Sequence, residues 1–428
     1  MKEELPHAWA RLHPMSPVVK GGQAVFAVLV LTASRSFDPS GGRRTQLLID
    51  LAIAGVALLA AFVSWWVTRW RVVGTELQLE TGLLRRQSIR VPLLRVQAID
   101  VVRPLAARAF GISELRIVLA GSGSGKSRLA YLSENRAQQV RAQLLAVGAG
   151  LAPETPEAPE RQLAAVPNAR LYVSALLLPV LVLVAALPLA ISLAVFAPDA
   201  VLPLLGGLFP LVFAFGTVVV RRVNDEFGFT LAGSPDGLRL RSGLFQTRAE
   251  TIPLHRIQAV RLVEPLLWRP FGWVRLEVDV AQQRERDAGQ SNPGALRRAL
   301  LPVGPRGEAD ALLARLLPGV STRPPAGARP PRRARWKAPL SYWLLASWYD
   351  GSQVVSRTGR LRAQTMVVPL EKVQSIRWSQ GPVQRRLGLA SVYVDTAGKG
   401  WLASARDRDV AQAREMLEEL PGLARAAR

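Results

Sequence analysis

Two long stretches of the chain contain no charged residue, and they constrain the fold more than any other feature. Residues 171–196 form the first stretch and residues 201–220 the second. Each is long enough to cross the hydrocarbon core of a bilayer, which takes about 20 apolar residues in a helix. The four residues between them leave room only for a tight turn, so the pair predicts a transmembrane helical hairpin. The alternative is a buried hairpin in a large soluble domain, but uncharged runs of this length rarely fit a globular core.

A second hairpin is expected nearer the N-terminus. Residues 51–67 form another apolar run, and tryptophan and arginine follow it as in an interfacial belt. Residues 21–34 are uncharged but short, and they reach spanning length only in a helix that begins near Met15. They could instead be a signal-peptide core, although no convincing cleavage site follows. The residues expected at the membrane interface are Trp65, Trp66, Arg69, Trp70, Arg71, Arg221 and Arg222.

Basic residues predict the orientation of the second hairpin. The turn at 197–200 has none, whereas Arg221 and Arg222 follow the second run directly. Cytoplasmic flanks are enriched in Lys and Arg, so the turn is predicted to face outward. The segments before and after this hairpin are then both cytoplasmic.

Composition argues against most chemistry. The chain has no cysteine and three histidines, which excludes disulfides and thiol catalysis and makes a histidine metal cluster improbable. We therefore expect no enzyme activity, no cofactor and no metal. The formal net charge of +23 suits an anionic membrane or nucleic acid, but no nucleic-acid motif accompanies it.

A motif recurs three times outside the apolar runs. It reads PLLRVQAI, PLHRIQAV and PLEKVQSI, with one glycine ten residues before its proline and another nineteen residues after it. A chance match would not reproduce both flanking spacings, so the chain contains an internal repeat. The motif residues, assigned structural roles in turns and a core, are Gly82, Pro92, Gln97 and Gly111 in the first copy, Gly243, Pro253, Gln258 and Gly272 in the second, and Gly359, Pro369, Gln374 and Gly388 in the third.

Each copy is predicted to contain short β-strands followed by one helix. Residues 274–280 alternate between apolar and charged side chains, which is typical of a half-buried strand. Helical segments are expected at 134–145, 308–317 and 409–420. Each unit is therefore predicted to be a small α+β module, a bent sheet pair or open barrel covered by its helix.

The motif and its glycine spacings resemble the bacterial pleckstrin-homology (PH) domain of the YdbS/YdbT-like membrane proteins, and the order of segments resembles the YdbT type over nearly the full length. The resemblance implies PH-like β-sandwiches capped by a C-terminal helix. It implies no ligand, but it does imply a YdbS-like single-domain membrane protein as a partner. The predicted segments are transmembrane hairpin 1 at 15–71, PH-like domain 1 at 72–149, an acidic Pro-rich linker at 150–170, transmembrane hairpin 2 at 171–222, PH-like domain 2 at 223–317, a basic Pro-rich linker at 318–337 and PH-like domain 3 at 338–421.

Three features suggest chemistry that the context does not support. Residues 120–127 nearly match a phosphate-binding P-loop, but they join two strand-like runs where a P-loop leads into a helix. Glu277 and Asp279 share one strand face, and such a pair is usually on the solvated face of a half-buried strand. His255 varies to Leu94 and Glu371 in the other copies, which indicates a surface position.

The expected function is a non-catalytic scaffold or sensor of membrane state in the cytoplasmic membrane of a bacterium, with all three PH-like domains in the cytoplasm. A lipid-handling or transport-related protein is the alternative, and nucleotide binding at residues 121–127 is a remote one. The expected partners are the lipid bilayer, the YdbS-like protein and further copies of the chain, and not nucleic acid.

Overall fold

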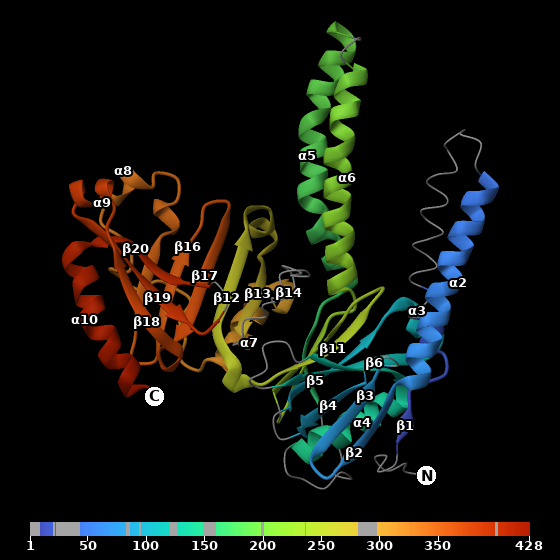
Figure 1. The fold of residues 1–428 in the computed structure, drawn as a ribbon. Coiled ribbons are helices and arrows are strands. Elements are labelled where there is room, and N and C mark those ends of the chain that lie inside the picture. Colours follow the sequence, from blue (N-terminus) through green and yellow to red (C-terminus); the bar gives the residue numbers. More distant parts are fainter. Residues whose placement is uncertain are drawn as a thin grey trace. The chain divides into compact units, whose positions relative to one another are not determined.

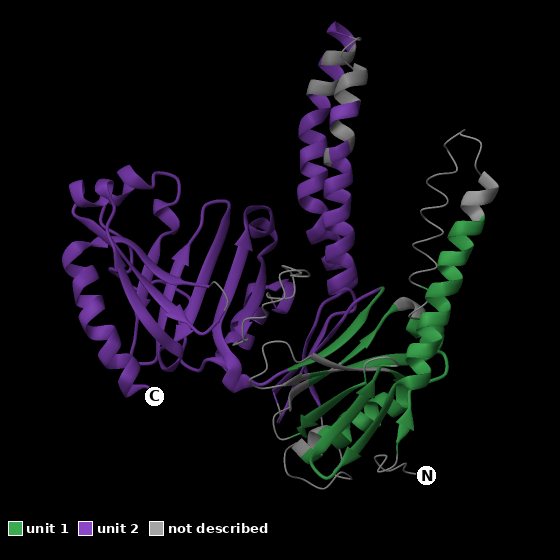
Figure 2. Ribbon diagram, in the orientation of Figure 1, with its two compact units in different colours: residues 1–159, 245–251 green, residues 160–244, 252–428 purple. Residues whose placement is uncertain are grey.

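The structure is a computed structural model that falls into two compact units (Figures 1 and 2). Unit 1 comprises Met1–Pro159 and Phe245–Thr251, and unit 2 comprises Glu160–Leu244 and Ile252–Arg428. The described residues are 9–19, 22, 43–82, 86–93, 96–119, 126–148, 160–197, 201–235, 237–280, 298–398 and 401–428.

Unit 1 contains the first domain, which has two antiparallel sheets and a covering helix. The first sheet has the order β1-β2-β3-β4. In the second sheet, β5 lies between β6 and β11, a strand that comes much later in the sequence. The elements are α2 (Arg43–Val67), β1 (Ala10–Arg11), β2 (Arg69–Val73), β3 (Glu76–Thr81), β4 (Gln87–Pro92), β5 (Val96–Arg103), α3 (Leu105–Ala109), β6 (Ile112–Leu119), β7 (Lys126–Ser133), α4 (Glu134–Gly148) and β11 (Thr247–Ile252).

Alternation along the strands builds the core of unit 1. In β2, Trp70 and Val72 are buried while Arg69 and Val73 are exposed, because successive side chains of a strand point to opposite faces. They pack with apolar residues of both sheets and with Leu144 of α4 in one cluster. Helix α4 therefore covers the sheets with an apolar face, as the sequence predicts for residues 134–145.

In the second domain, a long helical hairpin stands between two paired strands of unit 2. Strand β8 leads into helix α5, and helix α6 leads back into β9, which pairs antiparallel with β8 and β10 (Figure 1). The remaining strands β12, β13 and β14 pack with α7 around one core. The elements are β8 (Arg161–Ala165), α5 (Asn168–Phe196), α6 (Val201–Glu226), β9 (Thr230–Ser234), β10 (Gly237–Ser242), η3 (Leu254–Arg256), β12 (Ile257–Pro265), η4 (Leu266–Phe271), β13 (Trp273–Val280), β14 (Arg298–Pro305) and α7 (Arg306–Leu316).

The third domain shares a sheet with the second. Strand β17 pairs with β12, which gives a six-stranded sheet of order β14-β13-β12-β17-β16-β15 within unit 2. A three-stranded sheet, β18-β19-β20, and the C-terminal helix α10 complete the domain. The elements are α8 (Ala334–Lys337), η6 (Tyr342–Leu344), β15 (Ala346–Tyr349), β16 (Gln353–Thr358), β17 (Arg362–Pro369), η7 (Leu370–Lys372), β18 (Val373–Ser379), α9 (Pro382–Arg386), β19 (Leu389–Thr396), β20 (Ala403–Asp409) and α10 (Val410–Ala426).

The first motif glycine has the same backbone conformation in all three copies. Gly82, Gly243 and Gly359 have φ values of 97°, 117° and 122°. These values lie where a Cβ is strongly disfavoured. At Gly359 a Cβ would overlap the carbonyl oxygen of Arg362. The turns between β3 and β4, β10 and β11, and β16 and β17 therefore depend on glycine.

Both predicted linkers contain ordered segments. Residues 161–165, placed by sequence in the acidic linker, form β8 and pair with β9. In the basic linker, Ala328 and Ala334 are buried, and Arg408 donates hydrogen bonds to the carbonyl oxygens of Gly327 and Ala328. The sequence did not predict these ordered segments, because a proline-rich composition is typical of an extended spacer.

Candidate functional site

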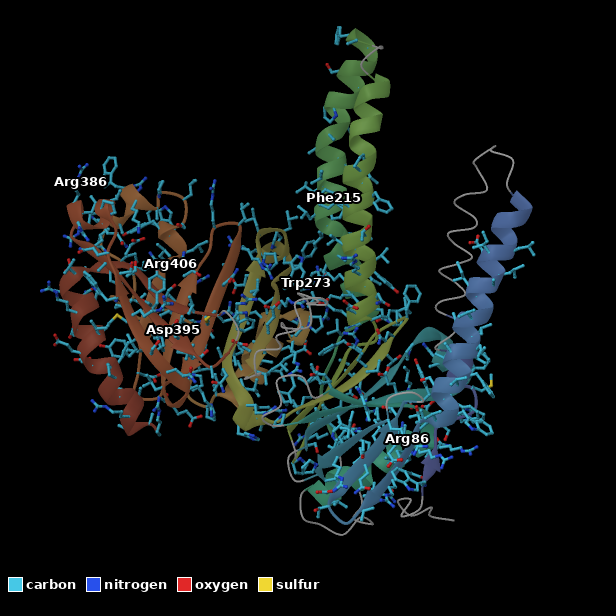
Figure 3. The ribbon with its side chains drawn as sticks, in the orientation of Figure 1. Arg86, Phe215, Trp273, Arg386, Asp395 and Arg406 are labelled. Carbon is cyan, nitrogen blue, oxygen red and sulfur yellow. The ribbon has the colours of Figure 1, made fainter. Side chains whose placement is uncertain are left out.

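Helices α2 and α5 expose apolar side chains along much of their length. Leu48–Val67 in α2 and Asn168–Pro188 in α5 are long and apolar enough to cross a membrane, and only 6% and 17% of these windows is buried. A helix in the core of a soluble protein would be mostly buried. Each leucine or valine left in water forgoes about 1.5–3 kcal/mol of burial. Figure 3 draws the side chains of the α5–α6 hairpin and labels Phe215 of α6, which is half-buried.

Hydrogen bonds join the base of the α5–α6 hairpin to the sheet that carries it. The backbone N–H of Val166 donates to the carbonyl oxygen of Phe229 at 3.1 Å. The N–H of Gly228 donates to Oδ1 of Asn168 at 3.0 Å. The strand pairing of β8 with β9 thus continues up to the first turn of the hairpin.

Inside the hairpin base, Ser174 of α5 is a shared acceptor. Its side chain is buried, and its Oγ accepts a hydrogen bond from Nη2 of Arg222 at 3.3 Å. Its carbonyl oxygen accepts one from Nε1 of Trp268, also at 3.3 Å. The guanidinium of Arg222 lies 4.9 Å from the centre of the Trp268 ring, a cation–π distance. The two helices and the 3-10 turn η4 therefore meet at one polar contact.

From Arg222 a row of alternating charges runs into the six-stranded sheet. Arg222 pairs with Glu226 at 3.2 Å, and Glu226 pairs in turn with Arg275 of β13. Nε of Arg275 lies 2.7 Å from one oxygen of Glu277. The other oxygen of Glu277 accepts a hydrogen bond from Nε of Arg261, on the neighbouring strand β12, at 3.0 Å.

The row ends at the third domain. The guanidinium of Arg261 lies 4.0 Å from the centre of the Trp401 ring, which is itself buried. Asp279 lies against Gly398, where any Cβ would overlap its carboxylate. The third domain therefore covers this face of β13, and Glu277 and Asp279 are each only 2% exposed. The prediction that these two carboxylates lie on a solvated strand face is wrong, because the face is covered by a domain distant in sequence.

Opposite charges determine the ionisation of this row. Burial alone would raise the pKa of Glu277, but the adjacent guanidinium groups of Arg275 and Arg261 outweigh it and hold that pKa below its usual value. Burial would likewise lower the pKa of Arg275, but Glu226 and Glu277 raise it overall. Since the folded-state pKa of Glu277 is lowered, its contribution to stability is present at neutral pH and is lost on acidification through that pKa.

The predicted interface residues near α2 divide between core and surface. Trp70 is 1% exposed and belongs to the core of unit 1, so its assignment to the membrane interface is wrong. Strand alternation explains this, because β2 begins at Arg69 and turns every second side chain inward. Trp66 is half exposed, and Trp65 donates from Nε1 to the carbonyl oxygen of Leu12 at 3.0 Å. Arg71 hydrogen-bonds Gln78.

The other two predicted interface residues are neighbours on α6 with different environments. Arg221 is exposed, whereas Arg222 takes part in the charge row. The sequence could not separate them, because Ser174 of α5 and Trp268 of η4, which contact Arg222, lie far from it along the chain.

The third domain exposes an aromatic and basic surface just before β15. Trp336 is 85% exposed, and Leu340 and Trp343 are each 60% exposed. The guanidinium of Arg335 lies 5.8 Å from the centre of the Trp343 ring. Tryptophan, leucine and arginine gathered in this way are typical of a surface that meets a membrane interface. We call Trp336, Leu340, Trp343 and Arg335 the aromatic surface.

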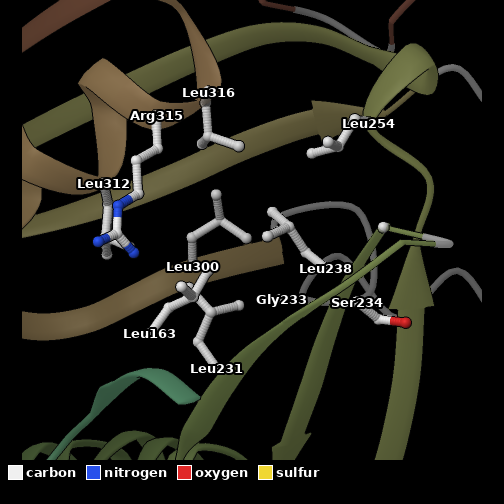
Figure 4. A pocket seen from close by; sticks show the side chains of 11 residues that line it. Leu163, Leu231, Gly233, Ser234, Leu238, Leu254, Leu300, Leu312, Arg315 and Leu316 are labelled. Carbon is white, nitrogen blue, oxygen red and sulfur yellow. The ribbon is translucent and has the colours of Figure 1, made fainter. Parts of the chain in front are cut away.

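A small apolar cavity lies in the second domain. It has a volume of about 160 Å³, close to that of cavities that bind a benzene-sized group (Figure 4). Leucines from β9, β10, β14 and α7 line it, and Arg315 is the one charged residue. The residues that line it are Leu163, Leu231, Gly233, Ser234, Gly237, Leu238, Leu254, Leu300, Leu312, Arg315 and Leu316.

The described residues contain no cluster of metal-ligating side chains. His255 is exposed in η3. The glycine loop at residues 120–125 lies outside the described residues. Its flanking strands β6 and β7 pair antiparallel, with Val118 opposite Lys126, whereas a P-loop leads into a helix.

Repeated small sheets, each closed by a helix, define an array of PH-like domains. The family model of the bacterial PH domain matches residues 24–147, 162–320 and 326–423. The chain therefore belongs to the bacterial PH domain family. Comparison with curated proteins and with solved structures gives no significant match. Family membership points to a binding or scaffold role.

Proposed function

We propose that this protein is a non-catalytic scaffold, anchored in the cytoplasmic membrane of a bacterium by two helical hairpins, with its PH-like domains in the cytoplasm. This layout is that of the YdbT type, and a YdbS-like single-domain membrane protein is then an expected partner. The observation that carries the proposal is the exposure of apolar side chains along α2 and α5. Water would not stabilise such helices, whereas a bilayer would.

The charge row gives the anchor a mechanical role. It connects the base of the α5–α6 hairpin to the sheet shared by the second and third domains through Arg222, Arg275 and Arg261. A tilt of the hairpin would have to break buried ion pairs, which is costly. Hairpin and domains therefore move together, and this supports a scaffold that responds to membrane state. The aromatic surface gives the third domain a second point of contact with anionic lipid, where each basic residue adds about 1 kcal/mol.

The absence of cysteine makes a labelling test clean. Asp199→Cys reports on the turn between α5 and α6, and Arg360→Cys reports on the third domain. In intact spheroplasts, a membrane-impermeant maleimide should label the first variant, and should label the second only after lysis. Equal labelling of both variants before lysis, or release of the protein at alkaline pH, would refute the proposal.

A lipid-handling role is the second candidate, and the cavity of the second domain favours it. Its leucine lining suits a short apolar group, and Arg315 suits an anionic head. Native mass spectrometry should find one stoichiometric lipid on the purified protein, and Leu238→Trp should displace it by filling the cavity. If wild type and variant both release mixed, substoichiometric lipid, the lipid-handling role is refuted and only the scaffold role remains.

A further inference from the structure

The PH-like domains are joined by one kind of strand pairing, which occurs twice. In unit 1, β5 of the first domain pairs with β11. In unit 2, β12 of the second domain pairs with β17 of the third. In each case a strand that leads up to a motif proline is added beside a strand that carries a motif glutamine. Both pairings are antiparallel.

The two joints also have the same register. In the first, Thr247, six residues before Pro253, lies opposite Arg103, six residues after Gln97. In the second, the residue six before Pro369 is Ala363, and it lies opposite Glu264, six residues after Gln258. An incidental contact would not repeat its register, because a slip of one residue turns every side chain to the other face.

Each of the two strand types in this pairing occurs once more, as the last strand at the edge of a sheet. Strand β18 carries the third motif glutamine and is the counterpart of β5 and β12. Strand β4 leads up to the first motif proline and is the counterpart of β11 and β17. Within the described part of the chain, β18 pairs only with β19 and β4 only with β3.

The two edges are exposed over the segments that the shared register would use. Residues 87–90 of β4 and residues 377–379 of β18 are exposed, and Ile376 is half-buried. Arg428 donates a hydrogen bond to the carbonyl oxygen of Val373, at the start of β18 and outside this segment. The pair Arg377 and Asp395, the latter labelled in Figure 3, spans β18 and β19 and lies on the sheet face, so it does not occupy the edge. Exposed edge strands of this kind are templates for a further strand.

We propose that β4 of one copy of this chain adds to β18 of a second copy in the register of the two internal joints. Ser88 then lies opposite Trp378, Ile89 opposite Arg377, and Arg90 opposite Ile376. The occupant is a second copy because the acceptor edge takes a strand leading up to the motif proline, and β4 is such a strand with an unpaired edge in the described structure. The contact is heterologous, so it builds rings or open rows of PH-like domains. It does not depend on the membrane proposal.

Cross-linking between two single-cysteine variants tests this pairing. Gln87→Cys and Ser379→Cys are opposite each other in the proposed register, at a separation a disulfide can span. The two full-length variants are mixed in detergent and oxidised, and a product of twice the monomer mass is expected. Gln87→Cys mixed with Ser352→Cys, an exposed residue outside β18, is the matched control. A yield no higher than in this control overturns the proposal.

A charge substitution separates the proposed register from random collision. In the Gln87→Cys partner, Ile89→Lys places a like charge opposite Arg377 and should lower the cross-linking yield about fivefold. Ile89→Glu places an opposite charge there and should keep the yield at the Ile89 level or above. Equal yields from the two variants overturn the proposal. A Gln87→Cys/Ser379→Cys double variant that cross-links only at monomer mass also overturns it, because β18 then accepts β4 of its own chain.

Discussion

Replacement of Glu277 by alanine should destabilise unit 2 strongly. The side chain is 2% exposed and accepts charge-assisted hydrogen bonds from Arg261 and Arg275, whose side chains are 9% and 15% exposed. With so little solvent, screening is weak, and the substitution leaves two buried guanidinium groups without this carboxylate. Breaking one buried pair costs about 3–5 kcal/mol. At about 2–4 °C per kcal/mol for domains of 150–250 residues, the midpoint of thermal unfolding should fall by roughly 6–20 °C.

Thermal unfolding in detergent, followed by circular dichroism at a fixed scan rate, measures this effect. Glu371→Ala is the matched control, because its carboxylate is 51% exposed and lies 3.0 Å from Nζ of Lys372. An exposed pair contributes about 0–1 kcal/mol, so the control should shift the midpoint by less than about 4 °C. Glu277→Gln keeps the shape and loses the charge, and it should lie between the two. A Glu277→Ala midpoint indistinguishable from that of the control would show that the charge row does not hold the domain.

Two further predictions concern a turn and a surface. Gly359→Ala should lower the free energy of unfolding by about 1–3 kcal/mol, because φ is 122° and the Cβ would meet the carbonyl oxygen of Arg362. Gly351→Ala is the control and should be nearly neutral, because no atom lies within 4 Å of the added Cβ. Urea denaturation of the two variants measures the difference. In vesicles containing anionic and brominated lipids, Trp336→Phe/Trp343→Phe should remove part of the quenching of tryptophan fluorescence, and quenching of the wild type should fall when the anionic lipid is omitted. Equal quenching in the variant and the wild type would show that the aromatic surface does not contact the membrane.

The elements that depend on local sequence were predictable. The alternating run at 274–280 forms β13, and the helices expected at 134–145, 308–317 and 409–420 correspond to α4, α7 and α10. The repeated motif predicted related domains, and the family match confirms them. Periodicity and turn residues carry this information within about ten residues, so one sequence suffices for it.

The candidate site was not predictable because its contacts are non-local. Glu277 has the alternation of a solvated strand face, and only the third domain, with Trp401 over Arg261, buries it. Trp70 follows an apolar helix closely enough to suggest an interface, yet β2 begins one residue earlier and directs it into the core. The cavity is likewise lined by segments from residue 163 to residue 316. The local pattern of apolar and charged residues does not show which distant segment packs against such residues in the fold.

The position of the α5–α6 hairpin explains how a PH-like domain can carry a long apolar hairpin without losing its sheet. The hairpin connects β8 to β9, which stay paired from Arg161 opposite Gly233 to Ala165 opposite Thr230. In unit 1, β1 and β2 are also paired, and α2 lies in the segment between them. In the third domain the segment before β15 is instead the short helix α8 and the turn η6, which carry the aromatic surface. Because the strands on either side of the insertion stay paired, the length of this one connection decides whether the domain carries a long apolar helix or a short exposed aromatic segment.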